Sequence, residues 1–334
     1  MKKADIIRAF KGEMVDRVPV GFWFHYADDE FQDVYENPEI RKRNIEGHKK
    51  FVEEVHPDFI KVMSDGYFKY PNPLLKSAKS IYELKDIEPL GENHPWIQDQ
   101  VTLIQEIVGN YPNEIASFYN MFSPATLFKF TIFDGDFDVI NNKLADFILE
   151  DEEMTKNMLL VLAEDLAILS KRVIAEGGVD GIYLSTQNIQ DDRITQELQM
   201  RVVKPSDFVV LDAAASEGGL NILHICGYEG ATNCLENYRD YPAPVFNYAQ
   251  AIESLPISEA KEFFGDKVIM GGFDNRTTGI LYRGSKEEIA DYTSKLIEKV
   301  GSERFIIGAD CTIPRDINIK NIVWVREAAK EFSK

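Results

Sequence analysis

Cysteine is scarce in this sequence, and long uncharged apolar runs are missing. Three cysteines in 334 residues cannot form a disulfide framework, so each is better explained as a metal ligand, a nucleophile or a core residue. No segment approaches the roughly 18 uncharged apolar residues that a membrane-spanning helix needs. Residues 1–5 open a charged amphipathic segment instead of the apolar stretch of a secretory signal. We therefore expect a cytoplasmic protein that does not contact a membrane.

Positive charge is also in short supply. The chain has 37 Lys and Arg residues against 56 Asp and Glu residues, which gives a formal net charge of −19. Binding to nucleic acid or to an anionic membrane depends on clustered Lys and Arg side chains that neutralise phosphate groups. We therefore expect no nucleic-acid partner.

The chain has no repeat and no linker rich in Pro, Gly or Ser, which favours a single domain over residues 1–334. Short runs of β-branched and aromatic residues alternate with longer segments of helical period, as in parallel βα architecture. The eight expected strands are Val18–Trp23, Phe59–Ser64, Glu114–Asn120, Gly181–Ser185, Asn221–Cys226, Pro244–Asn247, Lys267–Gly272 and Arg304–Ala309. We therefore predict an α/β fold, a single (β/α)8 or TIM barrel, which often reaches this length undivided.

The segments between the expected strands favour helices, with one exception. The clearest helices are Glu152–Glu176, Pro205–Ser216, Ser258–Phe264, Lys286–Val300 and Ile319–Phe332, and Ser285 with Glu288 forms a capping-box pattern. The exception is the proline-rich stretch Tyr67–Gln98, which we expect to be an irregular insertion after the second strand. Insertions that follow a strand lie at the carboxyl-terminal face of a barrel, so this segment is a candidate lid.

The most informative motif is Ile222-Leu223-His224-Ile225-Cys226-Gly227. His224 and Cys226 are two residues apart on an expected strand, so their side chains point the same way. Taken alone, such a pair is more often a matter of core or rim packing. Cys311 also follows an apolar strand, and the ends of these two strands can converge across a barrel mouth. One imidazole and two thiolates suit zinc and leave a fourth position open for substrate.

These residues resemble a known signature. A His-X-Cys at one strand end, followed far downstream by Cys311 in a Gly-Ala-X-Cys-X-X-Pro setting, resembles the zinc signature of the corrinoid-dependent methyltransferases of the uroporphyrinogen decarboxylase (URO-D) superfamily. The resemblance extends to Arg17–Val20, Phe59–Asp65, Gly178–Gly181 and Val268–Asp274, and so covers most of the chain.

The resemblance implies a URO-D-like barrel that holds zinc on His224, Cys226 and Cys311. It also implies that a methyl group moves between a corrinoid (methylcobamide) and the thiol or other heteroatom of a small-molecule donor or acceptor, as in the methylcobamide:thiol methyltransferases. Nothing in the sequence is similar to a corrinoid-binding domain, so a separate corrinoid-binding protein would carry the cobamide to the barrel mouth.

Two alternatives remain open at this stage. The first is a decarboxylase that acts on a porphyrinogen. Such enzymes resemble one another in a Met-Arg-Gln-Ala-Gly-Arg-Tyr segment after the first strand, but residues 21–29 here contain no arginine and two acids. Asp65 does match the essential aspartate of the decarboxylases. The second alternative is a non-catalytic barrel that binds a corrinoid carrier.

Further residues at strand ends are candidates for the same site. Asp65 is the expected catalytic group, as a general base, a fourth zinc ligand or a partner of a ligand, although a loop cap explains it equally well. We expect its carboxylate to point into the barrel mouth near the metal. The residues that could line the pocket are His25, Tyr119, Ser185 and Asp274, each of which could instead be an ordinary rim or packing residue.

Overall fold

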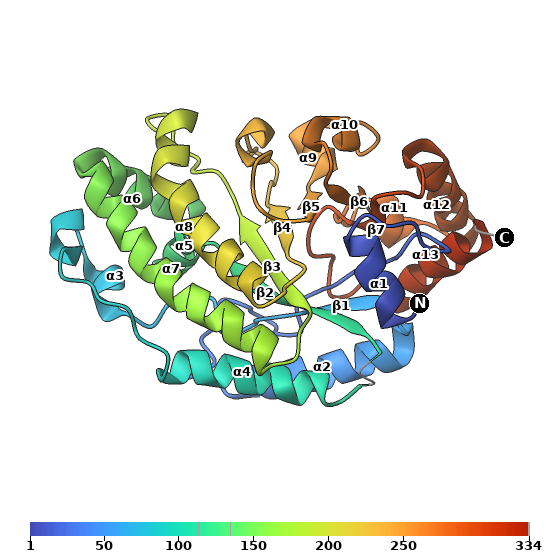
Figure 1. Cartoon of the computed structure of the whole chain (residues 1–334), viewed down its shortest axis with the longest axis horizontal. Coiled ribbons are helices and arrows are strands. Elements are labelled where there is room, and N and C mark those ends of the chain that lie inside the picture. Colours follow the sequence, from blue (N-terminus) through green and yellow to red (C-terminus); the bar gives the residue numbers. More distant parts are fainter. Residues whose placement is uncertain (112–113, 134, 333–334) are drawn as a thin grey trace.

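A curled parallel sheet organises the fold of the computed structural model, which describes residues 1–111, 114–133 and 135–332. Its strands are hydrogen-bonded to one another in chain order, each parallel to the next. They are β1 (Phe59–Val62), β2 (Ala116–Phe122), β3 (Gly181–Thr186), β4 (Ile222–Ile225), β5 (Val245–Tyr248), β6 (Val268–Phe273) and β7 (Phe305–Ala309). Figure 1 shows these strands at the centre of the molecule, with helices around them.

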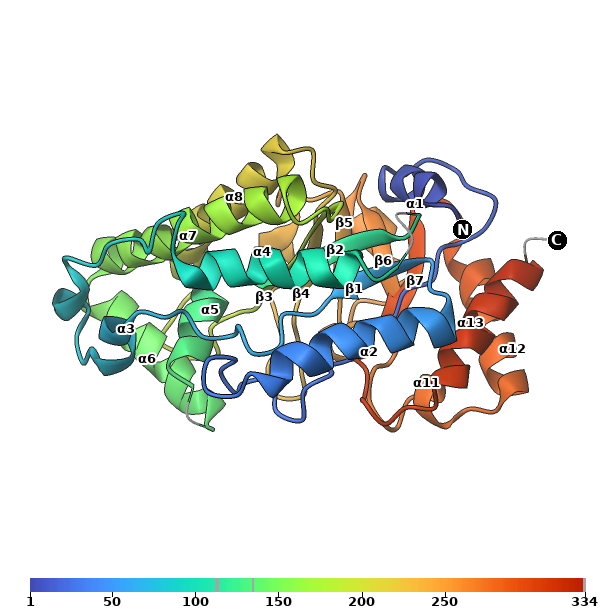
Figure 2. The same cartoon turned by 90° about the horizontal axis from the view of Figure 1, so that it is seen from below.

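The helices pack around the sheet. Helices α7 and α8 contact each other, as do α2 and α4, and α13 contacts both α12 and α2. Figure 2 shows α2 and α4 extended along the same side of the molecule. The helices are α1 (Lys3–Phe10), α2 (Glu39–Val55), α3 (Pro73–Ser77), η1 (Ile81–Leu84), α4 (Pro95–Val108), α5 (Pro124–Thr131), α6 (Phe137–Glu150), α7 (Glu152–Ala175), α8 (Gln196–Ser216), η2 (Leu235–Tyr238), α9 (Gln250–Glu253), α10 (Ala260–Phe264), α11 (Ile280–Arg283), α12 (Lys286–Val300) and α13 (Ile319–Phe332).

The inner face of the sheet has its own apolar cluster. Alternate residues point inward along each strand, so the first residues of several strands meet there: Phe59, Ala116, Ile222, Val245 and Val268. Helix α1 adds Ile6 and Phe10, and the Phe10 ring stacks on Phe118 with 4.5 Å between centroids. Helix α1 therefore closes the amino-terminal end of the sheet, and side chains further along the strands face the carboxyl-terminal end.

Residues 18–23, expected as the first strand, form only one bridge, between Val20 and Ile307 of β7. The Ile307 N–H donates to the Pro19 carbonyl at 2.8 Å. Toward β1 a side chain replaces strand pairing, because the Val20 N–H donates to Asp58 Oδ2 at 2.9 Å and Pro19 has no N–H to donate. The described residues therefore form seven strands where eight were expected.

The segment expected as an irregular lid contains α3 and η1 and packs mainly against α7. The buried carboxylate of Asp165 on α7 accepts a hydrogen bond from the Tyr70 hydroxyl at 2.5 Å. It also accepts the backbone N–H groups of Leu90 at 2.7 Å and Gly91 at 3.0 Å. A buried carboxylate therefore ties two parts of the segment to α7, while Phe68, near the start of the segment, lines a cavity at the carboxyl-terminal end of the sheet. The role of a lid stays a prediction.

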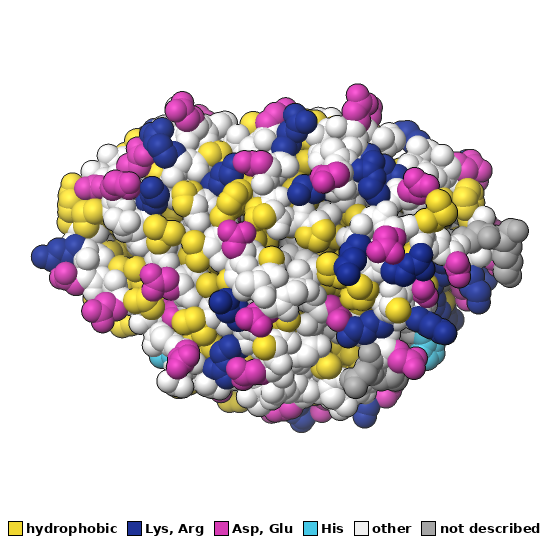
Figure 3. All heavy atoms as spheres, in the orientation of Figure 1, with side chains coloured by type: hydrophobic (Ala, Val, Ile, Leu, Met, Phe, Trp, Pro, Cys, Tyr) yellow, Lys and Arg dark blue, Asp and Glu magenta, His cyan; other side chains and the backbone are white. Residues whose placement is uncertain are grey.

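Two observations describe the helices and the surface of the molecule. None of the helices in the described ranges is both long enough and apolar enough to cross a membrane. On the face drawn in Figure 3, Lys and Arg side chains are interspersed with Asp and Glu side chains and form no broad basic area.

Candidate metal centre

His224, Cys226 and Cys311 meet at the carboxyl-terminal end of the sheet. His224 is the third residue of β4, Cys226 follows that strand directly, and Cys311 lies two residues beyond β7. Their ligand atoms all lie within 4.8 Å of one another, and they are the one such group of His, Cys, Asp or Glu among the residues that the structure describes. Two segments 85 residues apart in the sequence are thus brought together by the curl of the sheet.

The His224 ring is oriented by Asn247. The two residues are register partners on β4 and β5, so both side chains point inward. His224 Nδ1 lies 2.7 Å from Asn247 Oδ1. The amide nitrogen of Asn247 donates to the carbonyls of Met270 at 2.9 Å and Ala309 at 3.1 Å, which fixes its oxygen toward the ring.

This arrangement determines the tautomer of His224. Because Asn247 Oδ1 can only accept, Nδ1 is the ring nitrogen that carries the proton. His224 Nε2 is buried and has no hydrogen-bond partner in the described structure. An unprotonated, orphaned imidazole nitrogen beside two sulfur atoms is what a zinc ligand requires, with the amide as the supporting partner that metal-binding histidines usually have.

The two thiols interact with each other. The pKa of Cys311 lies well below its usual value because the Cys226 thiol donates a hydrogen bond to its sulfur, and nearby His224 acts in the same direction against the effect of burial. The pKa of Cys226 is raised by that same hydrogen bond and by burial. The two sulfur atoms therefore lie close enough to share one cation, whose binding would displace the thiol protons.

The loop after β4 is shaped around Cys226. The Cys226 N–H donates to the Thr186 carbonyl at 2.8 Å, and the Cys226 carbonyl accepts from Asn233 Nδ2 at 2.9 Å. Glu253 holds Asn233 in turn, through Asn233 N–H at 2.8 Å. A Cβ at Gly227 would lie 2.0 Å from Glu253 Oε1, so a larger residue there would push the Glu253 carboxylate away from Asn233.

A cavity of about 130 Å³ lies against the three ligand residues. One part of its wall is aromatic and the rest is polar. The full lining is His25, Glu30, Phe31, Lys61, Phe68, Asn120, Phe122, Thr126, Phe130, Ser185, Gln187, His224, Cys226, Cys311 and Thr312. The aromatic part is compact, with ring centroids 4.6 Å apart for Phe68 and Phe122 and 4.7 Å apart for Phe122 and Phe130.

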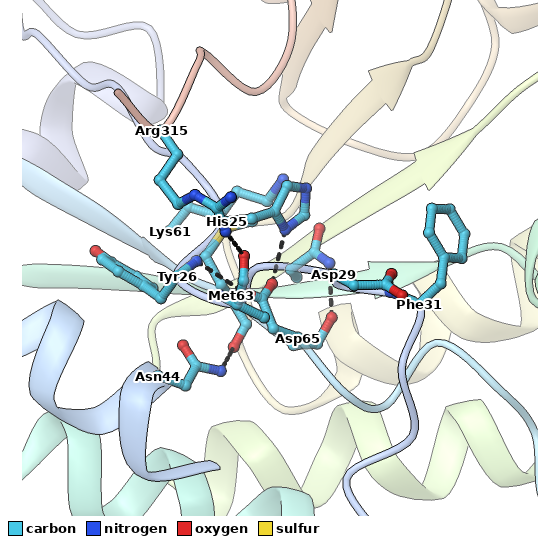
Figure 4. Close-up of polar contacts among 12 residues, drawn as sticks. His25, Tyr26, Asp29, Phe31, Asn44, Lys61, Met63, Asp65 and Arg315 are labelled. Atoms are coloured by element: carbon cyan, nitrogen blue, oxygen red, sulfur yellow. Dashed lines mark hydrogen bonds and ion pairs between the residues drawn. The ribbon is translucent and has the colours of Figure 1, made fainter. Parts of the chain in front are cut away.

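Asp65 lies behind His25 and does not line this cavity. Its fully buried carboxylate lies 2.7 Å from His25 Nδ1 and accepts the N–H groups of Tyr26 at 2.7 Å and Ala27 at 3.0 Å. Figure 4 shows the contact between His25 and Asp65, with Lys61 close by. Burial alone would raise the pKa of Asp65, but these hydrogen bonds hold it below its usual value. Asp65 therefore reaches the cavity only through the His25 ring.

His25 is a titratable group at the cavity wall. Burial alone would lower its pKa, but the hydrogen bond to Asp65 and the charges of Asp65 and Glu30 raise the pKa above its ordinary value of 6.5. Since the carboxylate of Asp65 accepts at Nδ1, the other ring nitrogen, Nε2, is free to exchange a proton on the cavity side.

The remaining expected pocket residues are divided. Ser185 lines the cavity. Tyr119 does not, because it lies on the outward face of β2, where its hydroxyl donates to Gln100 Oε1 at 2.7 Å. The next residue, Asn120, takes the inward position. Asp274 is paired with Arg276 at 2.8 Å and is also absent from the lining.

Sequence reasoning missed two lysines and the amide at this site. Lys61 lines the cavity, and burial lowers its pKa to about 8 against the opposing charges of Cys311 and Cys226. Lys129, on α5, is buried beside it, and burial lowers its pKa to about 7. Each lysine interrupts an apolar run, Phe59–Met63 and Leu127–Phe130, and this was the available signal. Asn247 interrupts the apolar strand Val245–Tyr248 and carries a similar signal.

A wider depression of about 770 Å³ lies at the opposite, amino-terminal end of the sheet. Its two arginines already have partners. Arg17 Nη1 donates to Asp58 Oδ2 at 2.7 Å, and Arg326 donates to the carbonyls of Val55 and His56. In parallel α/β sheets ligands bind at the carboxyl ends of the strands, so the group of His224, Cys226 and Cys311 is the better candidate for the functional site.

Comparisons with known proteins agree on the fold. A methyltransferase from Methanosarcina mazei shares it with a TM-score of 0.67 at 16% identity, over 99% of each chain. A B12-independent methionine synthase from Shewanella sp. W3-18-1, solved in complex with selenomethionine, has a TM-score of 0.58 at 12% identity, over 94% of this chain and 97% of the other. A putative vitamin-B12-independent methionine synthase from Listeria monocytogenes has a TM-score of 0.53 at 15% identity, over 94% and 96% of the two chains.

At such identities these structures establish the fold and nothing finer. No curated protein matches the chain in sequence. The sequence model of the family described as uroporphyrinogen decarboxylase (URO-D) matches residues 60–332. Because that match spans most of the chain, and the resemblance expected from the sequence is thereby confirmed, this protein belongs to the uroporphyrinogen decarboxylase family.

Proposed function

We propose that the protein is a zinc-dependent methyltransferase that moves a methyl group between a corrinoid and the thiol or other heteroatom of a small substrate. One observation carries the proposal. Two cysteines and a histidine converge within 4.8 Å at the end of the sheet where barrel enzymes work, and the histidine presents a buried, unpartnered Nε2 to the two sulfur atoms.

The donor set fits zinc better than other common metals. Thiolate and imidazole ligands select zinc, and three protein ligands leave one position for a substrate atom. Zinc held by His224 Nε2 and the sulfur atoms of Cys226 and Cys311 would supply Lewis-acid chemistry at the heteroatom that holds or accepts the methyl group. The adjoining cavity would place that heteroatom.

His25 is proposed to manage the proton of the reaction. Asp65 fixes the ring through Nδ1, so Nε2 can take a proton from an acceptor thiol or return one to a heteroatom that has lost its methyl group. Asp65 is then a positioning residue whose effect passes through His25. His25 Nε2 would accept a proton when a thiol is methylated and would donate a proton when a substrate is demethylated.

The methyl carrier is the part that relies on the sequence resemblance. One of the structures that share the fold is named as a methyltransferase and two are named as methionine synthases, which supports this class of chemistry, but both synthases are named as B12-independent. A separate corrinoid-binding protein is proposed as the partner, docking at the carboxyl-terminal end of the sheet. The proposal also takes the chain as a complete (β/α)8 barrel, with residues 18–23 in the eighth position and residues 67–98 added after β1.

Porphyrinogen decarboxylation is the alternative that the family description favours, and the cavity argues against it. A substrate with eight carboxylates needs several charge-assisted hydrogen bonds, for which arginine is best suited. None of the described residues that line the cavity is an arginine. A volume of about 130 Å³ is also close to the roughly 150 Å³ that accommodates a benzene molecule, far below the size of a tetrapyrrole.

Metal analysis followed by methyl transfer from methylcobalamin tests the proposal. We expect about one zinc per chain, lost in Cys226→Ala and Cys311→Ala but kept in the matched control Cys234→Ala, because Cys234 lies outside the group. The variants should remain folded. Wild-type protein that takes up no zinc on reconstitution would refute the central assignment. Bound zinc without turnover of any methyl donor would favour the non-catalytic, carrier-binding barrel.

A further inference from the structure

The side chain of Lys61 enters the barrel from the middle of β1. Its inward position follows from the alternation along Phe59-Ile60-Lys61-Val62-Met63, in which Phe59 and Met63 belong to the inner apolar cluster. The residue is only 7% exposed. Its ammonium nitrogen lies 3.8 Å from the centroid of the Tyr183 ring and 5.3 Å from that of Trp23.

Lys61 and Lys129 differ in what their ammonium groups contact. Lys129 Nζ donates to Asn141 Oδ1 at 3.1 Å, to Gln187 Oε1 and to the Asn188 carbonyl at 3.5 Å, which uses all three of its protons. Lys61 Nζ has no hydrogen bond and no ion pair to any residue in the described ranges, and its closest neighbours are ring faces. A lysine that is only 7% exposed and whose ammonium has no hydrogen-bonding partner among the described residues is costly. Its open side faces the cavity.

The charged groups around the cavity are of both signs, and their partners decide what each group can bind. Two thiolates would neutralise a bound divalent cation. The ammonium of Lys61 then adds one positive charge, and no carboxylate among the described residues forms an ion pair with it. The nearest acid, Asp65, is already engaged by His25 and two backbone N–H groups. Glu30 also lines the cavity and lies close enough to affect the charge of His25. A low-dielectric cavity strengthens the attraction of such an ammonium for an anion.

We propose that Lys61 binds an acid group of the substrate, so that the substrate is a small anion of about six to ten non-hydrogen atoms. This inference rests on the proposed function, since it places the reacting heteroatom at the metal centre of the same cavity. The size follows from the cavity volume of about 130 Å³, compared with the roughly 150 Å³ that holds benzene. The apolar part of the molecule would pack on Phe68, Phe122 and Phe130.

An isosteric pair of ligands tests the inference without turnover. 3-Mercaptopropionate and 3-mercaptopropionamide have the same shape and differ in charge. Calorimetric titration of the zinc-loaded protein should show the carboxylate binding roughly tenfold or more tightly than the amide, since a hydrogen bond to a charged group contributes that much. The preference should disappear in Lys61→Met and persist in Lys61→Arg and in the control Lys76→Met, which alters an exposed lysine on α3.

The outcomes separate this inference from the proposed function. Equal affinities for the two ligands, binding of neither, or an unchanged preference in a folded Lys61→Met variant would overturn the acid-group site. Should Lys61→Met fail to fold, the comparison of the two ligands on the wild-type protein still decides. The methyltransferase proposal fails on a different measurement, namely the absence of zinc or of methyl transfer.

Discussion

At the scale of single residues, Asn247 is the group on which the metal centre most depends without itself being a ligand. Its amide ties together β5, β6 and β7 through the carbonyls of Met270 and Ala309, while its oxygen fixes the His224 ring and accepts the Tyr183 hydroxyl at 2.7 Å. The Asn247 side chain thus both stabilises the sheet and orients the His224 ring.

Replacing Asn247 with leucine should therefore have two effects. We expect zinc affinity to fall about 10–100-fold, because the ring loses its supporting partner, and the free energy of unfolding to fall by about 1–3 kcal/mol, because buried polar groups lose theirs. The matched control is Asn221→Leu, which removes a buried amide whose oxygen accepts the Ile182 N–H at 3.2 Å. The control should lower stability but not zinc affinity. Chelator competition and urea unfolding measure the two quantities, and unchanged zinc affinity in Asn247→Leu would contradict the assignment.

Asp65→Asn should change the protonation of His25 more than the fold. An asparagine oxygen can still accept from the backbone, but its amide group cannot hold the imidazolium, so the pKa of His25 should fall from its raised value. A pKa that is raised in the folded state stabilises the protein fully at pH values below the ordinary pKa of 6.5. This stabilisation is lost as the pH rises through the folded-state pKa of His25. The wild type should therefore lose stability across that pH range, and the variant should not. NMR titration of His25 and urea unfolding measure this. Methyl transfer should fall about 10–100-fold; an unchanged rate and an unchanged His25 pKa would leave Asp65 as a loop cap alone.

The sequence was enough to predict that His224, Cys226 and Cys311 lie together, but not which residues surround them. His224, Cys226 and Cys311 are residue types with few other uses at strand ends, so their pattern was sufficient. Lys61 and Asn247 depend on which neighbour each side chain meets across the barrel, and no local pattern records that. Tyr119 illustrates the limit, since a shift of one residue along β2 separates the outward tyrosine from the inward Asn120.

At the scale of elements, alternation and capping predicted most of the fold. Seven of the expected strands overlap β1 to β7, and α12 and α13 have the expected bounds. The capping box of Ser285 and Glu288 is present. The expected start of a helix at Pro205 was wrong. Helix α8 begins at Gln196, where the Thr195 side chain caps the Leu198 N–H. A proline removes one hydrogen bond from a helix interior, and the long helix tolerates that loss.

Residues 18–23 have the sequence pattern of a strand but do not form a regular strand. Val18 and Val20 are buried as a strand would require. The position that a strand partner would occupy is taken instead by Asp58, which receives the Val20 N–H and the Arg17 guanidinium. The buried Asp58 carboxylate accepts a backbone N–H that would otherwise bond to a neighbouring strand, so no regular strand forms there.

At the scale of the whole molecule, the two ends of the sheet have separate tasks. Helix α1 and the inner apolar cluster fill the amino-terminal end, so a substrate can reach the metal centre only from the carboxyl-terminal end. The net charge of −19 is carried by the surface, while two buried lysines lie beside the thiols. A protein that is strongly acidic outside can therefore still favour an anion inside, since buried groups are screened much less than exposed ones.

This arrangement leads to a prediction about the reaction named by the family. Uroporphyrinogen should be neither bound tightly nor decarboxylated, because residues 21–29 supply no arginine and the cavity of about 130 Å³ cannot contain a tetrapyrrole. Anaerobic incubation with the porphyrinogen, followed by chromatography of the oxidised products, measures the reaction directly. A family decarboxylase treated in the same way serves as the positive control. Formation of coproporphyrinogen by the purified protein would contradict the argument from volume and charge. It would restore decarboxylation as the function, because methyl transfer does not produce coproporphyrinogen.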